Sequence, residues 1–158
     1  MASNLDFELI SPTKEFLYSG DFWSKLKIGR NSEGSYLKKL VALSKKDKTN
    51  IVMLIKENEI VGLIALSASR IDDLPCVQVD YLFVSTHYRK QIFKKLGDIK
   101  ISQYLISYAI QTSTTIKEKI GIKFLLLLPA DDALVKTYEN MDFKPLHSKT
   151  KWMVFKLA

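Results

Sequence analysis

The chain has 158 residues and a formal net charge of +7, with 24 lysines and arginines against 17 aspartates and glutamates. This length fits one domain with a substantial core, so we expect a single domain over residues 1–158. No apolar run approaches the roughly 20 residues that a membrane-spanning helix requires, so we expect no membrane partner.

The N-terminus has neither the basic start nor the apolar centre of a signal peptide, which predicts a cytoplasmic protein. A lone cysteine, Cys76, excludes an internal disulfide. His87 and His147 are far from each other and from Cys76 in sequence, so we predict no metal site. The positive charge favours an anionic partner such as a phosphate, a nucleic acid or an acidic peptide, although a basic solvated surface explains it equally well.

The first half of the chain predicts strands around a helical region. Residues 5–10 alternate in polarity and predict a strand. Residues 13–47 carry the signals of two helices, the second with apolar residues at helical spacing. Residues 51–56 and 60–69, separated by a short polar turn, predict a hairpin. A loop over 70–75 then leads to a further strand at 76–85.

The second half predicts a crossover and two closing strands. Residues 98–116 place apolar side chains on one helical face, with Asp98 as the expected N-cap after Gly97. Residues 122–128 are almost wholly apolar, which indicates a strand buried on both faces. A short helix capped by Asp131 or Asp132 follows, and strands at 142–148 and 151–157 end the chain.

The predicted fold class is therefore α/β, or α+β with one mixed sheet, in the order β-α-α-β-β-β-α-β-α-β-β. The three consecutive strands are expected to form an antiparallel meander. The strands at 76–85 and 122–128, joined by a helix, are expected to be parallel with a right-handed crossover.

The junction after the strand at 76–85 is the candidate binding site. Ligands of open sheets gather at the carboxyl ends of strands, and a helix N-terminus carries about half a positive charge. The loop over 86–97 adds several cationic or polar side chains there: Arg89, Lys90, Gln91, Lys94 and Lys95. This combination suits a pyrophosphate, and a basic solvated loop is the competing interpretation.

The segments at residues 57–67, 81–89 and 124–143 together resemble the GNAT (Gcn5-related) N-acetyltransferase family. YLFVSTHYR at 81–89 is similar to that family's fourth strand and the start of its acetyl-CoA loop. FLLLLPADDALVKTYENMDF at 124–143 resembles its fifth strand and the next helix, and ENEIVGLIALS at 57–67 resembles its hairpin turn. The resemblance covers residues 51–157. It implies a GNAT-like fold and acetyl-CoA as the acyl donor.

One departure from the family concerns the loop. The family's pattern, Arg/Gln-x-x-Gly-x-Gly/Ala, counted from Arg89, falls on Ile92 and Lys94. Either the glycines are replaced and cationic side chains do more of the binding, or residues are inserted and Gly97 is the surviving glycine. The length from Arg89 to the strand at 122 favours the insertion.

The resemblance implies transfer of an acetyl group to a primary amine in a ternary complex. It assigns thiol protonation to Tyr138 and implies that the backbone of Leu82, Phe83 and Val84 holds the pantetheine arm and thioester. Asp131 stands where the family often has an asparagine beside the cofactor. Asp80 is the candidate base or amine anchor, since a carboxylate within a strand must face a cavity or a partner; pairing with a lysine is the alternative.

Small amines, protein amines and the amino group of an aminoacyl-tRNA are alternative acceptors. An enzyme that acts on aminoacyl-tRNA could be the toxin of a toxin–antitoxin pair. Asp72, Asp73 and His147 are further candidates for the acceptor side. A GNAT-fold binding or regulatory module without catalysis is the alternative function, and a nucleic-acid-binding domain unrelated to coenzyme A is a third. A homodimer is compatible with the sequence.

Overall fold

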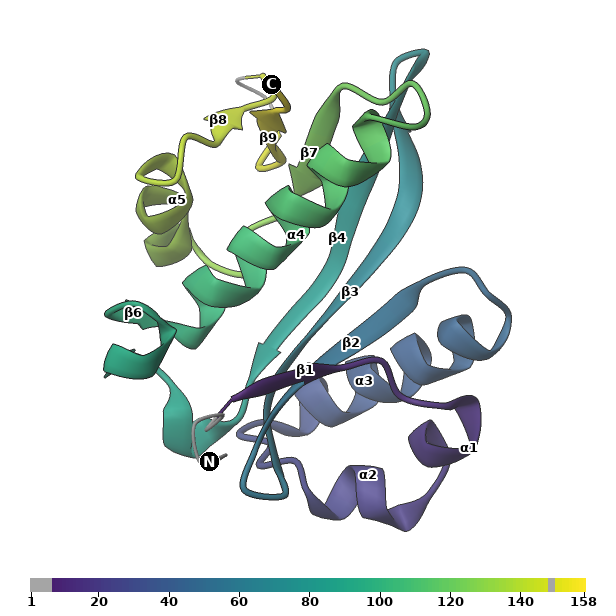
Figure 1. Ribbon diagram of the computed structural model, residues 1–158, viewed down its shortest axis with the longest axis vertical. Helices are drawn as coiled ribbons and strands as arrows, with labels where there is room; N and C mark the ends of the chain where they lie inside the picture. Colours follow the sequence, from purple (N-terminus) through teal and green to yellow (C-terminus); the bar gives the residue numbers. More distant parts are fainter. Residues whose placement is uncertain (1–6, 148–149) are drawn as a thin grey trace. The chain divides into compact units, whose positions relative to one another are not determined.

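The computed structural model describes residues 7–147 and 150–158 (Figure 1). The chain divides into two compact units. Unit 1 comprises residues up to Ala65 together with Tyr81–Ser107, and unit 2 comprises Leu66–Asp80 and Tyr108–Ala158. One sheet has the strand order β1-β2-β3-β4-β7-β9-β8, and a second, two-stranded sheet joins β5 and β6.

Unit 1 begins with strand β1 and three helices. Residues 5 and 6 of the expected first strand lie outside the described residues, and the remainder forms β1 (Glu8–Ile10), which pairs antiparallel with β2. The first predicted helix is instead two short helices, α1 (Lys14–Leu17) and α2 (Gly20–Ser24). Ser19 separates them because its backbone is extended and its hydroxyl accepts from Phe22 N–H at 3.4 Å.

Helix α3 (Asn31–Lys45) supplies much of the core of unit 1. Its Leu37, Leu40 and Val41 recur at helical spacing and are buried, while lysines take the outer side. They pack with apolar residues of the neighbouring helices and strands: Leu17, Phe22, Leu26, Ile51, Met53, Ile60, Leu63, Ala65 and Phe83.

The predicted hairpin is confirmed as β2 (Asn50–Lys56) and the first part of β3 (Glu59–Ile71). Glu57 and Asn58, between the strands, both have positive φ, at 48° and 71°. Two left-handed residues in a two-residue turn match the twist of the strands that they join. The hairpin geometry therefore follows from this turn.

The prediction of a loop over residues 70–75 is wrong. Strand β3 runs to Ile71 and β4 (Leu74–Val84) begins three residues later, leaving a tight turn at Asp72 and Asp73. Asp72 has φ of 53°, a backbone state that aspartate tolerates better than most residues. Turn chemistry, rather than a break in the sheet, explains the two acidic residues.

Unit 2 contains the predicted parallel pair. Strand β7 (Phe124–Leu127) is parallel to β4, with Val77 opposite Leu125. Leu125, Leu126 and Leu127 are all buried, as predicted for this strand. Strand β9 (Met153–Lys156) lies antiparallel on the other edge of β7, and the two-residue strand β8 (Lys144–Pro145) pairs with β9.

Two helices complete these elements. Helix α4 (Ile101–Lys117) begins in unit 1 and ends in unit 2. Helix α5 (Asp132–Glu139) has Asp131 as its N-cap, which accepts from Leu134 N–H at 3.1 Å, so the predicted cap is confirmed. Among residues 7–147 and 150–158, no helix combines the length and apolarity needed to cross a bilayer.

Candidate functional site

The end of β4 in unit 1 is tied to the neighbouring backbone by Ser85. This serine is fully buried; its N–H donates to Val61 O at 2.9 Å and its hydroxyl donates to Ile60 O at 2.6 Å. The same hydroxyl accepts from Lys27 N–H at 3.3 Å, and Thr86 N–H donates to Lys27 O at 2.9 Å. The start of the predicted phosphate loop is therefore fixed to β3 and to the segment after α2.

Arg89 holds the loop to helix α3. Its Nε donates to Val84 O at 2.7 Å, and its Nη2 donates to both carboxylate oxygens of Glu33 at 3.0 and 2.9 Å. The guanidinium carbon lies 5.5 Å from the centre of the Phe83 ring. Arg89 was predicted as a pyrophosphate ligand, and in the structure its Nε and Nη2 groups donate to protein acceptors.

The Glu33 carboxylate is the counterpart of this anchor. It also accepts from Gly29 N–H at 2.8 Å and from Arg30 N–H at 3.2 Å. Burial by itself raises the pKa of Glu33, but the hydrogen bonds from Arg89, Gly29 and Arg30 outweigh it, so the pKa lies below its ordinary value. Glu33 was missed from the sequence because nothing local links it to a residue 56 positions away.

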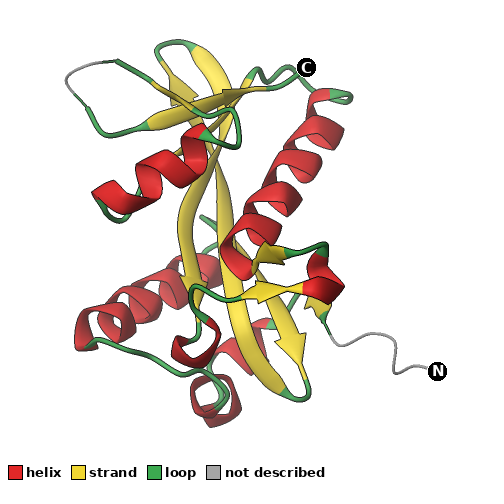
Figure 2. Ribbon diagram, turned by 90° about the vertical axis from the view of Figure 1, so that its left-hand side faces the viewer, coloured by secondary structure: helices red, strands yellow, loops and turns green. Residues whose placement is uncertain are grey.

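The segment after Arg89 differs from the prediction. Asp98 is not a helix N-cap: it has φ of 61°, and its N–H donates to Phe93 O at 3.0 Å. Between Arg89 and α4 lie β5 (Ile92–Phe93), the 3₁₀ turn η3 (Lys94–Leu96) and β6 (Ile99–Lys100), visible as two short arrows in Figure 2. This small hairpin occupies the stretch where an insertion was predicted.

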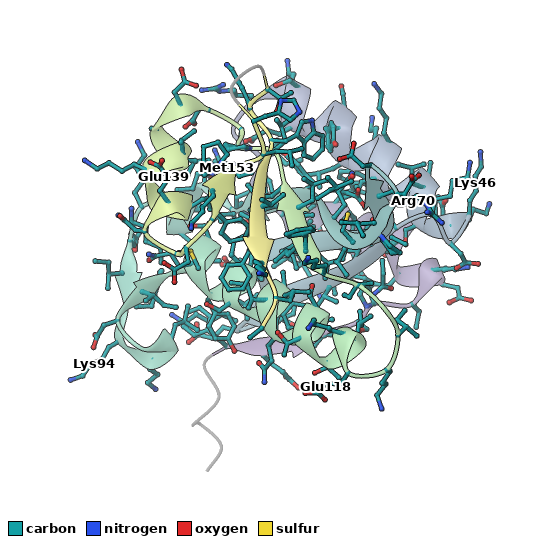
Figure 3. All side chains as sticks on the ribbon, turned by 90° about the horizontal axis from the view of Figure 1, so that it is seen from above. Lys46, Arg70, Lys94, Glu118, Glu139 and Met153 are labelled. Atoms are coloured by element: carbon teal, nitrogen blue, oxygen red, sulfur yellow. The ribbon has the colours of Figure 1, made fainter. Side chains whose placement is uncertain are left out.

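Gly97 closes the hairpin with φ of 97°, in the left-handed region where glycine is favoured. The side chains of Lys90, Lys94 and Gln91 are exposed around it, and Figure 3 shows Lys94 pointing away from the ribbon. The Gln91 amide donates to His87 O, which holds the turn after η2 (Thr86–Tyr88). The loop thus presents lysines to solvent while Arg89 is turned inward.

The last residues of β4 alternate as the strand pattern predicted. Phe83 is buried in the core, and Leu82 and Val84 are half-buried on the other face. The register with β7 ends at Gln78, so β4 continues for six residues beyond it to Val84. The Val84 carbonyl accepts from Arg89, as described above.

In unit 2, Asp80 lies on the polar face of β4. Its Oδ1 accepts from Ser67 Oγ at 2.9 Å and from Gln78 Nε2 at 2.8 Å, and the side chain is half-buried. Gln78 and Asp80 therefore share one strand face, as the alternation predicted. These two donors orient the carboxylate.

Tyr138, on α5, is a buried residue. It is 5% exposed, and its ring centre lies 5.9 Å from that of Phe143. Burial, reinforced by the nearby Asp131 carboxylate, raises the pKa of Tyr138 to about 12.

A hollow of about 310 Å³ opens in unit 2 beside the face of β4 that carries Gln78. His147 and Asp72, both named from the sequence, line it together with Trp152 and Gln78. Asp73 does not line it; its carbonyl accepts from Arg70 Nη1 at 3.4 Å. Among the described residues, no group of three or more His, Cys, Asp and Glu side chains is arranged to hold a metal ion.

Cys76 is the remaining reactive residue type. It is 2% exposed in β4, and burial raises the pKa of its thiol, with a hydrogen bond to Ser69 opposing the shift. A buried thiol of this kind behaves as a small core residue rather than a nucleophile.

Comparison with solved structures decides the fold. AtaTR bound with AcCoA superposes with a TM-score of 0.79 over 96% of this chain and 94% of that chain, at 16% identity. This chain has the GNAT fold. AtaT complexed with acetyl-methionyl-tRNAfMet gives a TM-score of 0.77 at 15% identity, covering 96% of this chain and 95% of that one.

A Tyr-to-Phe mutant of KacT gives a TM-score of 0.77 at 12% identity, again over 96% of this chain and 95% of that one. No protein-family model matches the sequence, and no curated protein matches it. The GNAT fold predicted from the sequence motifs is therefore confirmed by three-dimensional similarity, at identities where sequence comparison finds nothing.

Proposed function

We propose that this GNAT-fold protein is an acetyl-CoA-dependent N-acetyltransferase that acts on a primary amine. The observation that carries the proposal is Tyr138, a buried tyrosine on α5 at the position to which the GNAT resemblance assigns protonation of the thiol. Support also comes from the fold, since AtaTR has been solved bound with AcCoA.

The donor is assigned first. Lys90, Gln91, Lys94, Gly97 and Asp98 belong to the segment proposed to receive the diphosphate, with exposed lysines as its cations. The backbone of Leu82, Phe83 and Val84 is proposed to accompany the pantetheine arm and thioester. Arg89 supports this segment through its hydrogen bonds to Val84 and Glu33.

The reaction forms one bond and breaks another. The neutral amine attacks the thioester carbonyl carbon, the C–N bond forms, and the C–S bond breaks to release the thiolate. Tyr138 gives its proton to the sulfur, and the proton lost by the amine returns to Tyr138 through water, either directly or by way of Asp80. A raised pKa keeps the Tyr138 hydroxyl protonated until the thiolate develops. The pKa of the coenzyme A thiol also rises in a desolvated site, which favours transfer of the proton to the sulfur.

Asp80 is proposed to anchor the amine or to take its proton. Its Oδ1 accepts hydrogen bonds from Ser67 and Gln78, which hold the carboxylate in place. Asp131 is proposed to lie beside the cofactor; its Oδ1 already accepts from Leu134 N–H as the α5 cap.

For the acceptor we infer the amino group of an aminoacyl-tRNA. A net charge of +7 favours a polyanionic substrate, and the structural neighbour AtaT has been solved with acetyl-methionyl-tRNAfMet. AtaT is also described as a toxin bound by the antitoxin AtaR, so an adjacent antitoxin gene would support the same role here. A cytoplasmic location and a homodimer stay predictions.

One observation favours the alternative, a GNAT-fold module that binds without catalysis. The loop from Ser85 to Ile92 has no glycine, and its arginine is paired with Glu33. Such a module would be stabilised by acetyl-CoA but would not release free thiol with any amine.

The test measures binding and turnover separately. Acetyl-CoA at 100 times its Kd should add about 2.7 kcal/mol to the free energy of unfolding, seen as a raised Tm. Lys90→Gln with Lys94→Gln should weaken this stabilisation, whereas Lys46→Gln, on an exposed lysine after α3, should not. Thiol release would then be followed with aminoacyl-tRNA, a lysine peptide and a polyamine; no stabilisation by acetyl-CoA would refute the proposal.

A further inference from the structure

A second hollow, of about 470 Å³, lies wholly in unit 1 and has no part in the function proposed above. It is lined by one aromatic residue, two cationic residues and small residues of the adjoining segment: Trp23, Ile28, Gly29, Arg30, Asn31, Gly34, Ser35 and Lys38. Among the residues that the structure describes, no carboxylate lines it, so the described wall is cationic and aromatic.

Trp23 is held rigidly in this wall. Its ring packs edge-on against the fully buried Phe22, with ring centres 5.0 Å apart, and it lies against the core cluster of α1, α2 and α3. The residue is nevertheless only half-buried, so part of the indole stays accessible. A fixed and partly open indole is a stacking surface whose ordering cost has already been met by the fold.

The two cations of the hollow are uncompensated. In the described part of the chain, neither the Arg30 nor the Lys38 side chain has a hydrogen-bond or ion-pair partner. The acid nearest in sequence, Glu33, has its oxygens directed to Arg89 and to the backbone of Gly29 and Arg30. An anion in the hollow therefore meets positive charge that no protein carboxylate neutralises.

Helix α3 contributes one face to the hollow. Asn31, Gly34, Ser35 and Lys38 recur at i, i+3, i+4 and i+7, on a face that adjoins the core residues of the same helix. A Cβ at Gly34 would meet only Ile28 Cδ1, at 3.8 Å, so packing does not require glycine there. Glycine disfavours a helix relative to alanine, and its presence keeps the hollow open.

We propose that this hollow binds a nucleotide unit, with the base stacked on Trp23 and a phosphate between Arg30 and Lys38. Aromatic side chains stack on the π-face of any base, while cations take the backbone phosphate. An acidic peptide would use the cations but would leave the indole without a planar partner. The two sources of a nucleotide unit are a single-stranded nucleic acid and a free nucleotide.

The experiment reads Trp23 fluorescence in a Trp152→Phe background, since the chain has two tryptophans. Titrants are a short single-stranded RNA, AMP, an aspartate-rich peptide and acetyl-CoA. RNA or AMP should quench Trp23. A strand that binds more tightly than AMP assigns the site to nucleic acid, and equal affinity assigns it to a free nucleotide.

Matched variants locate the binding. Lys38→Gln should lower affinity and reduce the slope of log K against log salt by about 0.7–1 for a strand, whereas the adjacent Lys39→Gln, which does not line the hollow, should change neither. Gly34→Ala should lower affinity without lowering the Tm. Trp23→Leu should lower affinity by at least about tenfold.

Several results would overturn the site. Equal effects of Lys38→Gln and Lys39→Gln would mean a diffuse basic surface. Quenching by the acidic peptide as strong as that by RNA would remove the role of stacking. Quenching by acetyl-CoA that exceeds that by both RNA and AMP would give the hollow to the acyl donor, whereas acetyl-CoA stabilisation without quenching leaves the acetyltransferase proposal standing independently.

Discussion

Replacing Glu33 with glutamine tests whether the contact with Arg89 holds the loop after β4. The carboxylate accepts two hydrogen bonds from Arg89 Nη2, one from Gly29 N–H and one from Arg30 N–H. Glutamine keeps one oxygen for the backbone donors but loses the charge and one oxygen facing the guanidinium. The change therefore isolates the ion pair from the turn that it stabilises.

The expected loss follows from the partial burial of the pair. Hydrogen bonds to charged groups contribute about 1.5–3 kcal/mol each, but the side chains of Arg89 and Glu33 are 33% and 20% exposed, so solvent screens part of this. We expect Glu33→Gln to lower the free energy of unfolding by about 1–2 kcal/mol at pH 7. Glu118→Gln, on an exposed carboxylate at the end of α4 labelled in Figure 3, should stay within about 0.5 kcal/mol of the parent.

The free energy of unfolding measured below neutral pH gives a second test of the same contact. The folded-state pKa of Glu33 lies below 4.5, so its contribution is present above that pH and is lost as pH falls through the folded-state pKa. Urea unfolding from pH 7 to pH 3 should show this loss in the parent and a smaller one in Glu33→Gln. Equal stability of the two proteins at pH 7, or identical acid limbs, would refute the anchoring role. A cycle with Arg89→Gln should give a coupling energy of about 1 kcal/mol.

Substitutions at three further positions test the proposed mechanism and the packing of the fold. Tyr138→Phe should lower acetyl transfer by about 10²-fold or more while leaving acetyl-CoA stabilisation unchanged; equal activity by thiol release would remove Tyr138 from the mechanism. The same variant should flatten alkaline unfolding, because a pKa raised from 10.0 to about 12 gives stability, on the order of 3 kcal/mol, that is present below pH 10 and lost as pH rises through 12. Gly62→Ala should lower the free energy of unfolding by about 1–3 kcal/mol, since its Cβ would lie 3.0 Å from Phe83 O and from Ile101 Cγ2; an unchanged urea midpoint would contradict this. Asp131→Ala should cost about 1 kcal/mol as a lost α5 cap, and Asp131→Asn should recover most of it.

Local sequence patterns predicted the elements whose signals are contained within them. The apolar run at 124–127, the polar turn at Glu57 and Asn58, and the cap at Asp131 each depend on residues close together in the chain. The same is true of the alternation that places Gln78 and Asp80 on one face. These predictions succeeded because periodicity and turn chemistry are short-range properties.

The predictions that failed depend on partners distant in sequence or on competing local choices. Asp98 follows a glycine and precedes an amphipathic helix, yet it adopts a left-handed turn because β5 and β6 pair before the helix begins. The pairing of Glu33 with Arg89 spans 56 positions and leaves no periodic trace. The second hollow likewise joins the end of α2 to the face of α3, which only the folded chain brings together.

The shielding of Cys76 has a practical consequence. Because the sole native thiol is in the interior and its thiolate is disfavoured at neutral pH, maleimide dyes should leave the parent protein almost unlabelled. A cysteine introduced at an exposed position would then carry the probe alone, so spectroscopic reporters can be installed without first removing a background site.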